Sequence, residues 1–270
     1  MKYSEAQPAS LAHYVKCFWS LERERPEDVA AKEPILPDGC VEIVFNLGDR
    51  FQRFHADGTI ELQPRSIIAG QMRGSVLIGP TGRVRLFGIR FQPAGAGAFF
   101  RFPLFEITDR IEPLQAVWSN EGCYLIEKLA ATETFEEASS LVEFELSKVL
   151  RCGRSATLVG QVVHEIEKAR GSAPTCELGK AYGLSERQLE RLFKESVGLS
   201  PKMFSRIVRF QNVIKSLESG RGDELLDMAL DYGYFDQSHM IREFKEFAGK
   251  SPLRFIAGDH RISEFFVGTA

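Results

Sequence analysis

Hydrophobic and polar positions alternate along the first hundred residues and then change to a helical spacing. In the segment GRVRLFGIRFQPAG, Arg83 and Arg85 alternate with Val84 and Leu86. The segment ILPDGCVEIVFNLG opens with a Pro-Asp-Gly turn, continues as a β-branched and aromatic run and ends at a glycine. Strands at this spacing, with Gly and Pro between them, predict a sandwich or barrel-like sheet.

After Pro103 the apolar residues recur at helical intervals. Residues 114–150 predict two or three helices, and the small, polar segment 151–157 predicts a domain boundary. From Leu158 to about Phe255 the pattern is helical throughout. The expected fold class is α+β with two domains: a β-rich, cupin-like or barrel-like domain with trailing helices at 1–150, an all-α domain at 151–256, and a tail at 257–270.

One frame, F-K-E-x-x-G-x-S-P, occurs twice in the helical part, at 193–201 and 244–252. In the first copy a short helix over 176–182 is expected to end at Gly183, which suits a left-handed turn. Ser185 with Gln188 three positions later forms a capping-box pattern that begins the next helix. Each copy therefore predicts a short helix, a glycine turn and a second helix.

The second helix of the first unit has one buried and one polar face. Its buried stripe is Leu189, Leu192 and Phe193, at positions i, i+3 and i+4. The opposite face carries long polar side chains, which are Arg187, Glu190, Arg191 and Lys194.

The second copy repeats this plan. A helix over 225–232 ends at Gly233, and Asp236 is the expected N-cap of the next helix. Its core residues are Met240, Phe244 and Phe247, and its outward residues are Ser238, His239 and Arg242. A small residue, Gly179 or Ala229, lies four positions before each glycine turn, where two helices have to cross closely.

These features predict two helix-turn-helix units, at about 174–196 and 224–247, joined by a linker helix at about 201–217. In such a unit the second helix enters the major groove of DNA. Two units on a rigid spacer could occupy successive major grooves, about 34 Å apart. One such helix pair is also common in ordinary helical cores, and it is the matched second copy that favours DNA binding.

The segment 157–255 resembles the C-terminal DNA-binding domain of the AraC/XylS family of bacterial transcription regulators. The residues that carry the resemblance are GLSERQLERLFKESVGLSP, the linker-helix Arg209 and MALDYGYFDQSHMIREFKEFAGKSP. Three positions depart from the family pattern: Gly179 stands where Ala is usual, Phe235 where Ser is commoner, and Ile256 where Arg often ends the domain.

The resemblance implies base contacts from the outer faces of the two second helices. Arginine pairs with guanine, glutamine with adenine, and glutamate accepts from cytosine; the residues implied are Arg187, Glu190, Arg191, Gln237, Ser238, His239 and Arg242. Phosphate contacts, which give affinity without sequence information, are assigned to Lys194, Lys202, Arg209 and Lys245. The alternative for each charged residue is a solvated face.

The segments PDGCVEIVFNLG and GIRFQPAGAGAFF resemble a β-rich domain of unknown function that precedes this DNA-binding domain in some regulators. The resemblance implies a small-molecule sensor or a dimerisation module. Arg90, a charge within an apolar strand, could anchor an anionic ligand, or it could form a structural ion pair with Glu42 or Asp38. A third interpretation is a pure protein-interaction module that uses the helices of 114–150.

Composition indicates a soluble globular protein, with 44% hydrophobic and 26% charged residues. The net charge of −3 argues mildly against a nucleic-acid ligand, but 185–215 carries seven basic and three acidic residues, a local +4. No apolar run approaches the roughly 20 residues of a membrane span, and the N-terminus lacks a signal-peptide pattern. Five cysteines without a C-x-x-C spacing predict a reduced, cytoplasmic protein with neither a zinc site nor disulfides.

No enzymatic motif emerges from the sequence. The five histidines form no H-x-H or H-x-x-x-H pair, and neither a G-x-S-x-G elbow nor a G-x-x-x-x-G-K loop occurs. Some DNA-repair alkyltransferases carry a related DNA-binding domain with a reactive cysteine, but nothing near Cys40 in the sequence would lower its pKa. We therefore expect a non-enzymatic, sequence-specific transcription factor without cofactor or metal. Its expected partners are promoter DNA, RNA polymerase and a small-molecule effector, and the sequence leaves open whether it forms a homodimer. The alternative is a protein-interaction or alkyltransferase-type protein.

Overall fold

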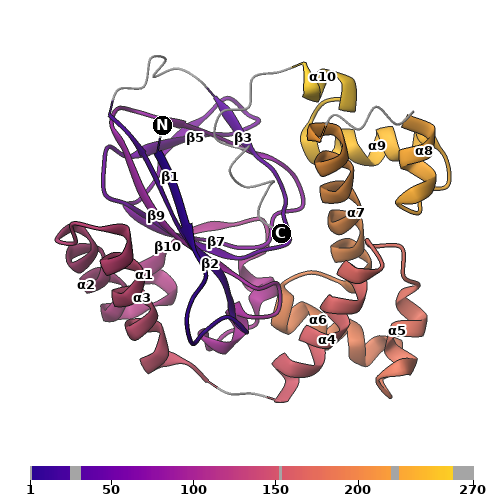
Figure 1. The fold of residues 1–270 in the computed structure, drawn as a ribbon, viewed down its shortest axis with the longest axis horizontal. Coiled ribbons are helices and arrows are strands. Elements are labelled where there is room, and N and C mark those ends of the chain that lie inside the picture. The colour runs from indigo at the N-terminus through magenta and orange to yellow at the C-terminus, as the bar shows by residue number, and fades with distance from the viewer. Residues whose placement is uncertain (1, 25–31, 152–153, 220–224, 258–270) are drawn as a thin grey trace.

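The computed structural model of the chain describes residues 2–24, 32–151, 154–219 and 225–257. Figure 1 shows a β-rich body formed by the N-terminal part and a helical part packed on one side of it. The trailing helices of the N-terminal part lie on the opposite side of the body. The predicted β-rich and all-α regions are both present.

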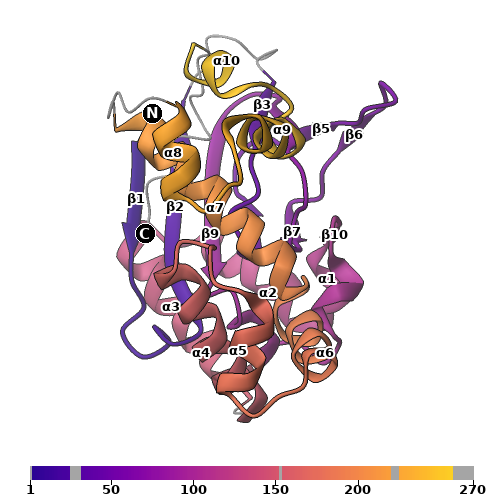
Figure 2. The same ribbon diagram turned by 90° about the vertical axis from the view of Figure 1, so that its right-hand side faces the viewer.

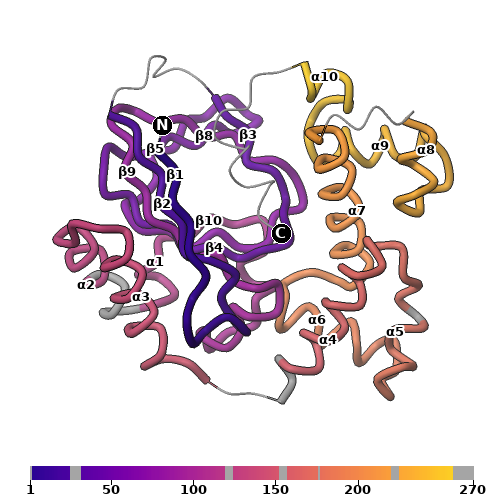
Figure 3. The backbone as a smooth tube through the Cα atoms, in the orientation of Figure 1, coloured from indigo at the N-terminus to yellow at the C-terminus, as the bar shows by residue number. Residues whose placement is uncertain are grey.

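Two antiparallel sheets form the β-rich body. The six-stranded sheet has the order β1-β2-β9-β4-β7-β10, and the four-stranded sheet has the order β3-β8-β5-β6. In Figure 3 the strands curve into an open ring, as expected of a barrel-like domain. The strands are β1 Lys2–Ala6, β2 Val15–Arg23, β3 Glu33–Ile35, β4 Glu42–Asn46, β5 Phe51–Phe54, β6 Ile60–Leu62, β7 Ser66–Ala69, β8 Val76–Pro80, β9 Val84–Phe91 and β10 Ile111–Pro113.

The six-stranded sheet separates two hydrophobic cores, because successive side chains of a strand point to opposite faces. On β4, Ile43 and Phe45 belong to a large core that includes the trailing helices. Val44, between them, packs against a smaller core that contains Trp19 of β2 and Phe51 of β5. The smaller core thus lies between the two sheets.

The trailing helices cover the outer face of the six-stranded sheet. Two short 3-10 helices, η1 Ala96–Ala98 and η2 Leu104–Ile107, precede them. Thr134 caps α3 through a capping box with Glu137, so the third helix begins where local chemistry satisfies its first N–H groups. The helices are α1 Leu114–Val117, α2 Ser119–Ala130 and α3 Phe135–Val149.

The helical part consists of α4 to α10. The predicted boundary segment 151–157 is not a loop throughout, because α4 already begins at Arg154; residues 152 and 153 and the tail from 258 lie outside the described residues. The helices are α4 Arg154–Lys168, α5 Thr175–Ala181, α6 Glu186–Val197, α7 Pro201–Glu218, α8 Leu225–Asp231, α9 Gln237–Ala248 and α10 Pro252–Ile256. Within the described residues, no helix combines the length and apolar character that crossing a membrane requires.

The two parts are in direct contact. The Thr108 hydroxyl donates to Gly198 O at 2.6 Å, and the Gln211 side-chain amide donates to Pro37 O at 2.5 Å. Leu36 and Ala94 of the β-rich part are buried in the hydrophobic core of the helical part. The helical part is therefore fixed to the β-rich domain through the end of α6 and through α7.

Candidate DNA interface

The first helix-turn-helix unit is formed by α5 and α6. Gly183 has φ +68°, in the left-handed region, and Leu184 N donates to Gly179 O at 2.9 Å across the turn. The Ser185 hydroxyl accepts from Gln188 N, and the Gln188 side chain accepts from Ser185 N, which is the predicted capping box. Gly198 ends α6 with φ +91°.

The second unit, α8 and α9, has the same construction. Gly233 has φ +72°, and Tyr234 N donates to Ala229 O at 2.8 Å. The Asp236 carboxylate caps α9 by accepting from His239 N at 2.6 Å, and Gly249 ends the helix with φ +72°. The repeated frame in the sequence thus corresponds to a repeated structure.

The small residues before the glycine turns lie where the helices cross. Ala229 is fully buried, and a Cβ atom built on Gly179 would lie 3.0 Å from the Leu184 carbonyl oxygen. A larger side chain would separate α5 from α6, because the neighbouring atom is backbone. The short side chains therefore permit the close crossing that the unit requires.

The linker helix α7 separates the two recognition helices, α6 and α9. It contains 18 residues, which corresponds to about 27 Å. Figures 1 and 2 show α6 towards one end of α7 and α9 towards the other. The spacing along α7 is of the order of the roughly 34 Å between successive major grooves.

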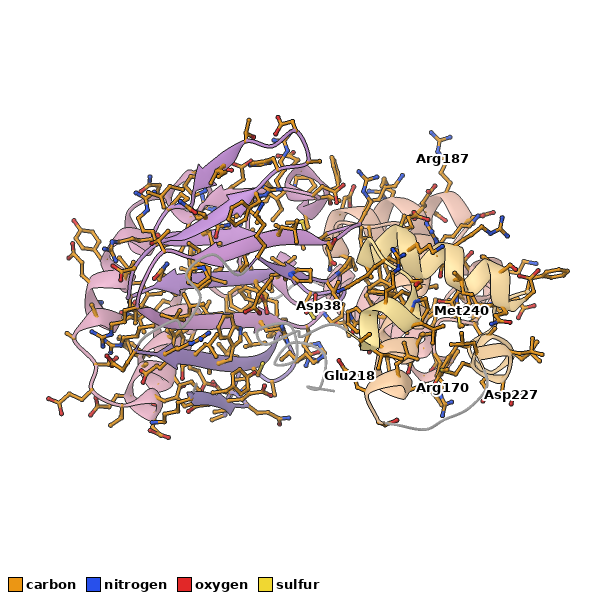
Figure 4. All side chains as sticks on the ribbon, turned by 90° about the horizontal axis from the view of Figure 1, so that it is seen from above. Asp38, Arg170, Arg187, Glu218, Asp227 and Met240 are labelled. Atoms are coloured by element: carbon orange, nitrogen blue, oxygen red, sulfur yellow. The ribbon has the colours of Figure 1, made fainter. Side chains whose placement is uncertain are left out.

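The predicted contact residues of α6 are accessible. Arg187, Glu190 and Arg191 are all exposed, and Figure 4 shows Arg187 pointing away from the body. Along the helix, Arg191 pairs with Glu195 at 3.1 Å, and Lys194 pairs with Glu190 at 3.4 Å. Exposed ion pairs of this kind are weak, so Arg191 and Lys194 can exchange their carboxylate partners for groups of a nucleic acid.

The outer face of α9 agrees in part with the expectation. Ser238 and Arg242 are exposed, whereas Gln237 is half-buried. The His239 ring is also half-buried, and it lies edge-on against Tyr234 at 5.4 Å between ring centroids. His239 is therefore partly engaged by the turn that precedes its own helix, which the outward prediction did not include.

Three of the four residues assigned to phosphates are exposed, namely Lys194, Lys202 and Lys245. Arg209 is different, because its side chain is only 15% exposed. Its guanidinium donates to Gly171 O at 3.1 Å and to the Glu243 carboxylate at 3.3 Å. This geometry argues against a phosphate contact and makes Arg209 a link between α7, α9 and the end of α4.

Glu243 is the centre of this link, and the sequence pattern did not reveal it. Its side chain is 3% exposed, and Arg206 donates to its carboxylate at 2.7 Å. Burial raises the pKa of the neighbouring Tyr234, and the Glu243 charge adds to that rise. The position of Glu243 directly before the buried Phe244 was the signal in the sequence that could have indicated its burial. Both residues lie on the side of α9 that faces α7.

Phe235 is a second residue whose place only the structure shows. It directly precedes the N-cap of α9 and is 88% exposed. The N-terminal residues of a recognition helix approach base edges, and phenylalanine can contact the thymine methyl group. Phe235 therefore presents an accessible aromatic ring beside the N-terminus of α9.

Arg90 of the β-rich domain forms the ion pair that was the alternative to a ligand anchor. Its guanidinium lies 2.6 Å from Glu42 and 3.4 Å from Asp38, and the side chain is 2% exposed. Burial raises the pKa of Glu42, while the Arg90 charge opposes that rise. Because two carboxylates already neutralise Arg90, the geometry does not favour it as a receptor for an anion.

Cys40 gives no sign of an activated thiol. It is buried, and burial together with the Asp38 carboxylate raises its pKa. A nucleophilic cysteine needs the opposite shift. The described residues also contain no group of three or more His, Cys, Asp or Glu side chains placed to hold a metal ion.

Two family models match the chain, one in each part. Residues 178–258 match a family described as a helix-turn-helix domain, and residues 4–113 match a domain of unknown function, DUF6597. The first match covers both helix-turn-helix units from α5 onward. The second covers the strands of the β-rich domain.

The chain is also similar to a curated relative and to solved structures. The chain is 31% identical to the HTH-type transcriptional regulator MtrA of Neisseria gonorrhoeae over 113 residues. These residues make up 42% of this chain and 37% of the length of that protein. ToxT from Vibrio cholerae superposes with TM-score 0.50 at 10% identity over 89% of this chain and 98% of that one. A second ToxT structure, bound to (E)-4-(8-methylnaphthalen-1-yl)but-3-enoic acid, gives TM-score 0.52 at 8% identity over the same shares. At such identities the likeness to ToxT is one of fold.

Proposed function

We propose that this chain, whose C-terminal domain is of the AraC/XylS type, is a sequence-specific DNA-binding regulator of bacterial transcription. The observation that carries the proposal is the pair of matched units, α5–α6 and α8–α9. Each has the same cross-turn hydrogen bond, the same kind of side-chain N-cap and a left-handed glycine at both ends of the recognition helix. Each exposes a polar helix face.

Base contacts are proposed for the exposed residues of the two recognition helices. Arg187 and Arg191 on α6 and Arg242 on α9 can form paired hydrogen bonds with guanine, while Glu190 can accept from cytosine. Ser238 and the half-buried Gln237 and His239 complete the second face. Lys194, Lys202 and Lys245 contact phosphates.

The DNA site is expected to be asymmetric and about two helical turns long. One chain already holds two different recognition helices, so a monomer can occupy such a site, and a homodimer is not needed for recognition. The bound regulator acts in the cytoplasm by recruiting or blocking RNA polymerase. A small-molecule effector bound by the β-rich domain is supported by the fold likeness to a ToxT structure that contains a bound organic acid.

The test is selection of duplex fragments from the source genome by the full-length chain, with the bound DNA sequenced. The unaltered protein should enrich one asymmetric motif. The double variant Arg191→Ala, Arg242→Ala should lose it, since each substitution removes about 1–3 kcal/mol at the cognate site.

The matched control is Arg83→Ala with Lys128→Ala, which removes two exposed positive charges from the β-rich part. This control should retain the motif. Equal loss in both double variants would reduce the interaction to non-specific electrostatics, and enrichment of no motif at low or moderate salt would contradict the proposal.

A further inference from the structure

The turn of the second helix-turn-helix unit is one residue longer than the turn of the first. In the first unit, Leu184 alone separates the turn glycine from the N-cap Ser185. In the second unit, Tyr234 and Phe235 together separate the glycine from the N-cap Asp236. Leu184 and Tyr234 donate the equivalent hydrogen bonds across the two turns. Tyr234 is therefore the counterpart of Leu184, and Phe235 has no counterpart in the first unit.

The extra residue carries the most exposed large apolar side chain in the described part of the chain. The Phe235 side chain is 88% exposed, whereas its neighbour Tyr234 is buried. The backbone N–H of Phe235 donates to His239 Nδ1 at 3.4 Å, much as Gln188 accepts from the Ser185 N–H in the first unit. The backbone of the extra residue is thus held in place, although packing within the protein does not account for its ring.

The exposed polar groups of α9 gather at the end of the helix where Phe235 lies. Ser238 and Arg242 are one turn apart on the same face. Arg242 Nε donates to Ser238 O at 3.3 Å, so the guanidinium lies back over the first turn of α9. The N-terminal residues of a recognition helix contact base edges. A base pair beside the one that Arg242 contacts therefore comes within reach of the Phe235 ring.

The chemistry of a phenyl ring limits what it can recognise in a major groove. The ring has no strong hydrogen-bond donor or acceptor, so it does not distinguish the polar edges of the bases. Thymine presents a C5-methyl group there, which apolar side chains contact. The predicted contact residues of α6 are charged, namely Arg187, Glu190 and Arg191, so a methyl contact of this kind belongs to the half of the DNA site that α9 occupies.

We propose that Phe235 is a specificity-determining residue that selects thymine, through its methyl group, at one position of the half-site contacted by α9. The selected thymine lies beside the base pair that Arg242 contacts. This inference rests on the proposed function, because it needs a cognate DNA site. It makes the two half-sites chemically different, since charged side chains read one of them and an arginine with an apolar ring reads the other.

The test uses the full-length chain and the duplex that genomic selection enriches. Each thymine of the duplex is replaced in turn by deoxyuridine, which lacks only the C5-methyl group. The half-site of α9 is the one whose base preference is lost in Arg242→Ala. Within it, deoxyuridine at one position should weaken binding about fourfold, the effect of one buried methyl group. Phe235→Ala should bind the thymine and deoxyuridine duplexes equally well.

Two further variants separate methyl recognition from other effects. Phe235→Leu retains an apolar side chain and should still prefer thymine to deoxyuridine. Phe144→Ala removes another exposed ring, which is 60% exposed and lies on α3 of the β-rich part, and it should retain the fourfold preference. Because both rings are exposed, neither alanine variant should lower the unfolding temperature, so a lost preference is not a loss of folding.

Three results would overturn the inference while the proposed function stands. The enriched motif contains no thymine in the α9 half-site, every deoxyuridine has the same effect on the unaltered protein and on Phe235→Ala, or Phe144→Ala loses the preference as Phe235→Ala does. Failure of the proposed function looks different, because the selection then enriches no motif at all. In that case the assignment of Phe235 falls together with the function.

Discussion

Arg209 and Lys202 both lie on α7, but only Lys202 is exposed to solvent. The sequence assigned both to phosphates, since a long basic side chain looks the same whether it faces water or a buried carboxylate. The structure places Arg209 against Glu243 and Gly171. The difference depends on which residues of α9 and α4 lie opposite, which no local pattern contains.

Arg209→Ala is expected to lower the free energy of unfolding by about 2 kcal/mol, because it leaves part of a buried carboxylate unpaired. The salt dependence of DNA binding should not change. Lys202→Ala is the matched control: stability should be retained, and the slope of log affinity against log salt should fall by about 1. Denaturant unfolding and binding at several salt concentrations measure both quantities. A reduced salt slope in Arg209→Ala would restore the phosphate assignment.

Glu143 is the acidic residue that holds the loop before β2. Its carboxylate accepts from the N–H groups of Ala9, Ser10 and Leu11 at 3.1, 2.5 and 3.2 Å. Burial alone would raise its pKa, but these hydrogen bonds, with one from the Ser10 hydroxyl, outweigh burial and lower it below the usual 4.5. The stabilisation is therefore present above pH 4.5 and is lost as the pH falls through the lowered pKa.

Glu143→Gln should lower the free energy of unfolding by about 1 kcal/mol at pH 7 and by less at pH 3. Denaturant titrations of both proteins at the two pH values give the comparison. Equal decreases in the free energy of unfolding at pH 7 and pH 3 would show that the ionised Glu143 carboxylate stabilises the fold no more than a neutral side chain.

At the scale of elements, the helices of the C-terminal part followed from local signals. The capping box at Ser185, the N-cap at Asp236 and the left-handed glycines satisfy helix ends with groups a few residues away, so the pattern alone identified them. The start of α4 at Arg154 was missed because small polar residues carry no strong preference for a loop over a first helical turn.

The crossing of α5 and α6 is expected to tolerate no large residue at Gly179. Gly179→Val should destabilise the unit by about 3 kcal/mol and abolish binding to the cognate site, because the added atoms meet the Leu184 carbonyl. Gly160→Val in α4 is the control with the same chemical change, since a Cβ there meets nothing within 4 Å. Thermal unfolding and DNA binding measure the two effects, and similar behaviour of both variants would reject the role of close packing.

At the scale of the whole molecule, the first helix-turn-helix unit is attached to the β-rich domain while α8 to α10 lie at the far end of α7 (Figures 1 and 2). The hydrogen bonds of Thr108 with Gly198 and of Gln211 with Pro37 join the β-rich and helical parts, between which the sequence predicted a boundary at residue 151. A change inside the β-rich domain can thus reach α6 and α7 before it reaches α9.

Thr108→Val with Gln211→Leu is expected to remove both hydrogen bonds and to lower the free energy of unfolding by about 2 kcal/mol. The single calorimetric transition should broaden or split, because the two domains would then unfold more independently. Thr132→Val, whose hydroxyl bonds Leu129 O within the β-rich domain, should lower stability without splitting the transition. An unsplit transition in the double variant would mean that apolar contacts alone couple the domains.

The sequence by itself determined the succession of a β-rich and an all-α part, the repeated helix-turn-helix units and the exposed face of α6, because these depend on periodicity, caps and turns within a few residues. Only the tertiary structure decided the sheet order, the burial of Glu243 with Arg206 and Arg209, and the pairing of Arg90. Those features join residues tens of positions apart, and their energies come from burial and from the partner that the fold places opposite. The sequence gives the charge of a side chain, whereas the tertiary structure determines which group neutralises it.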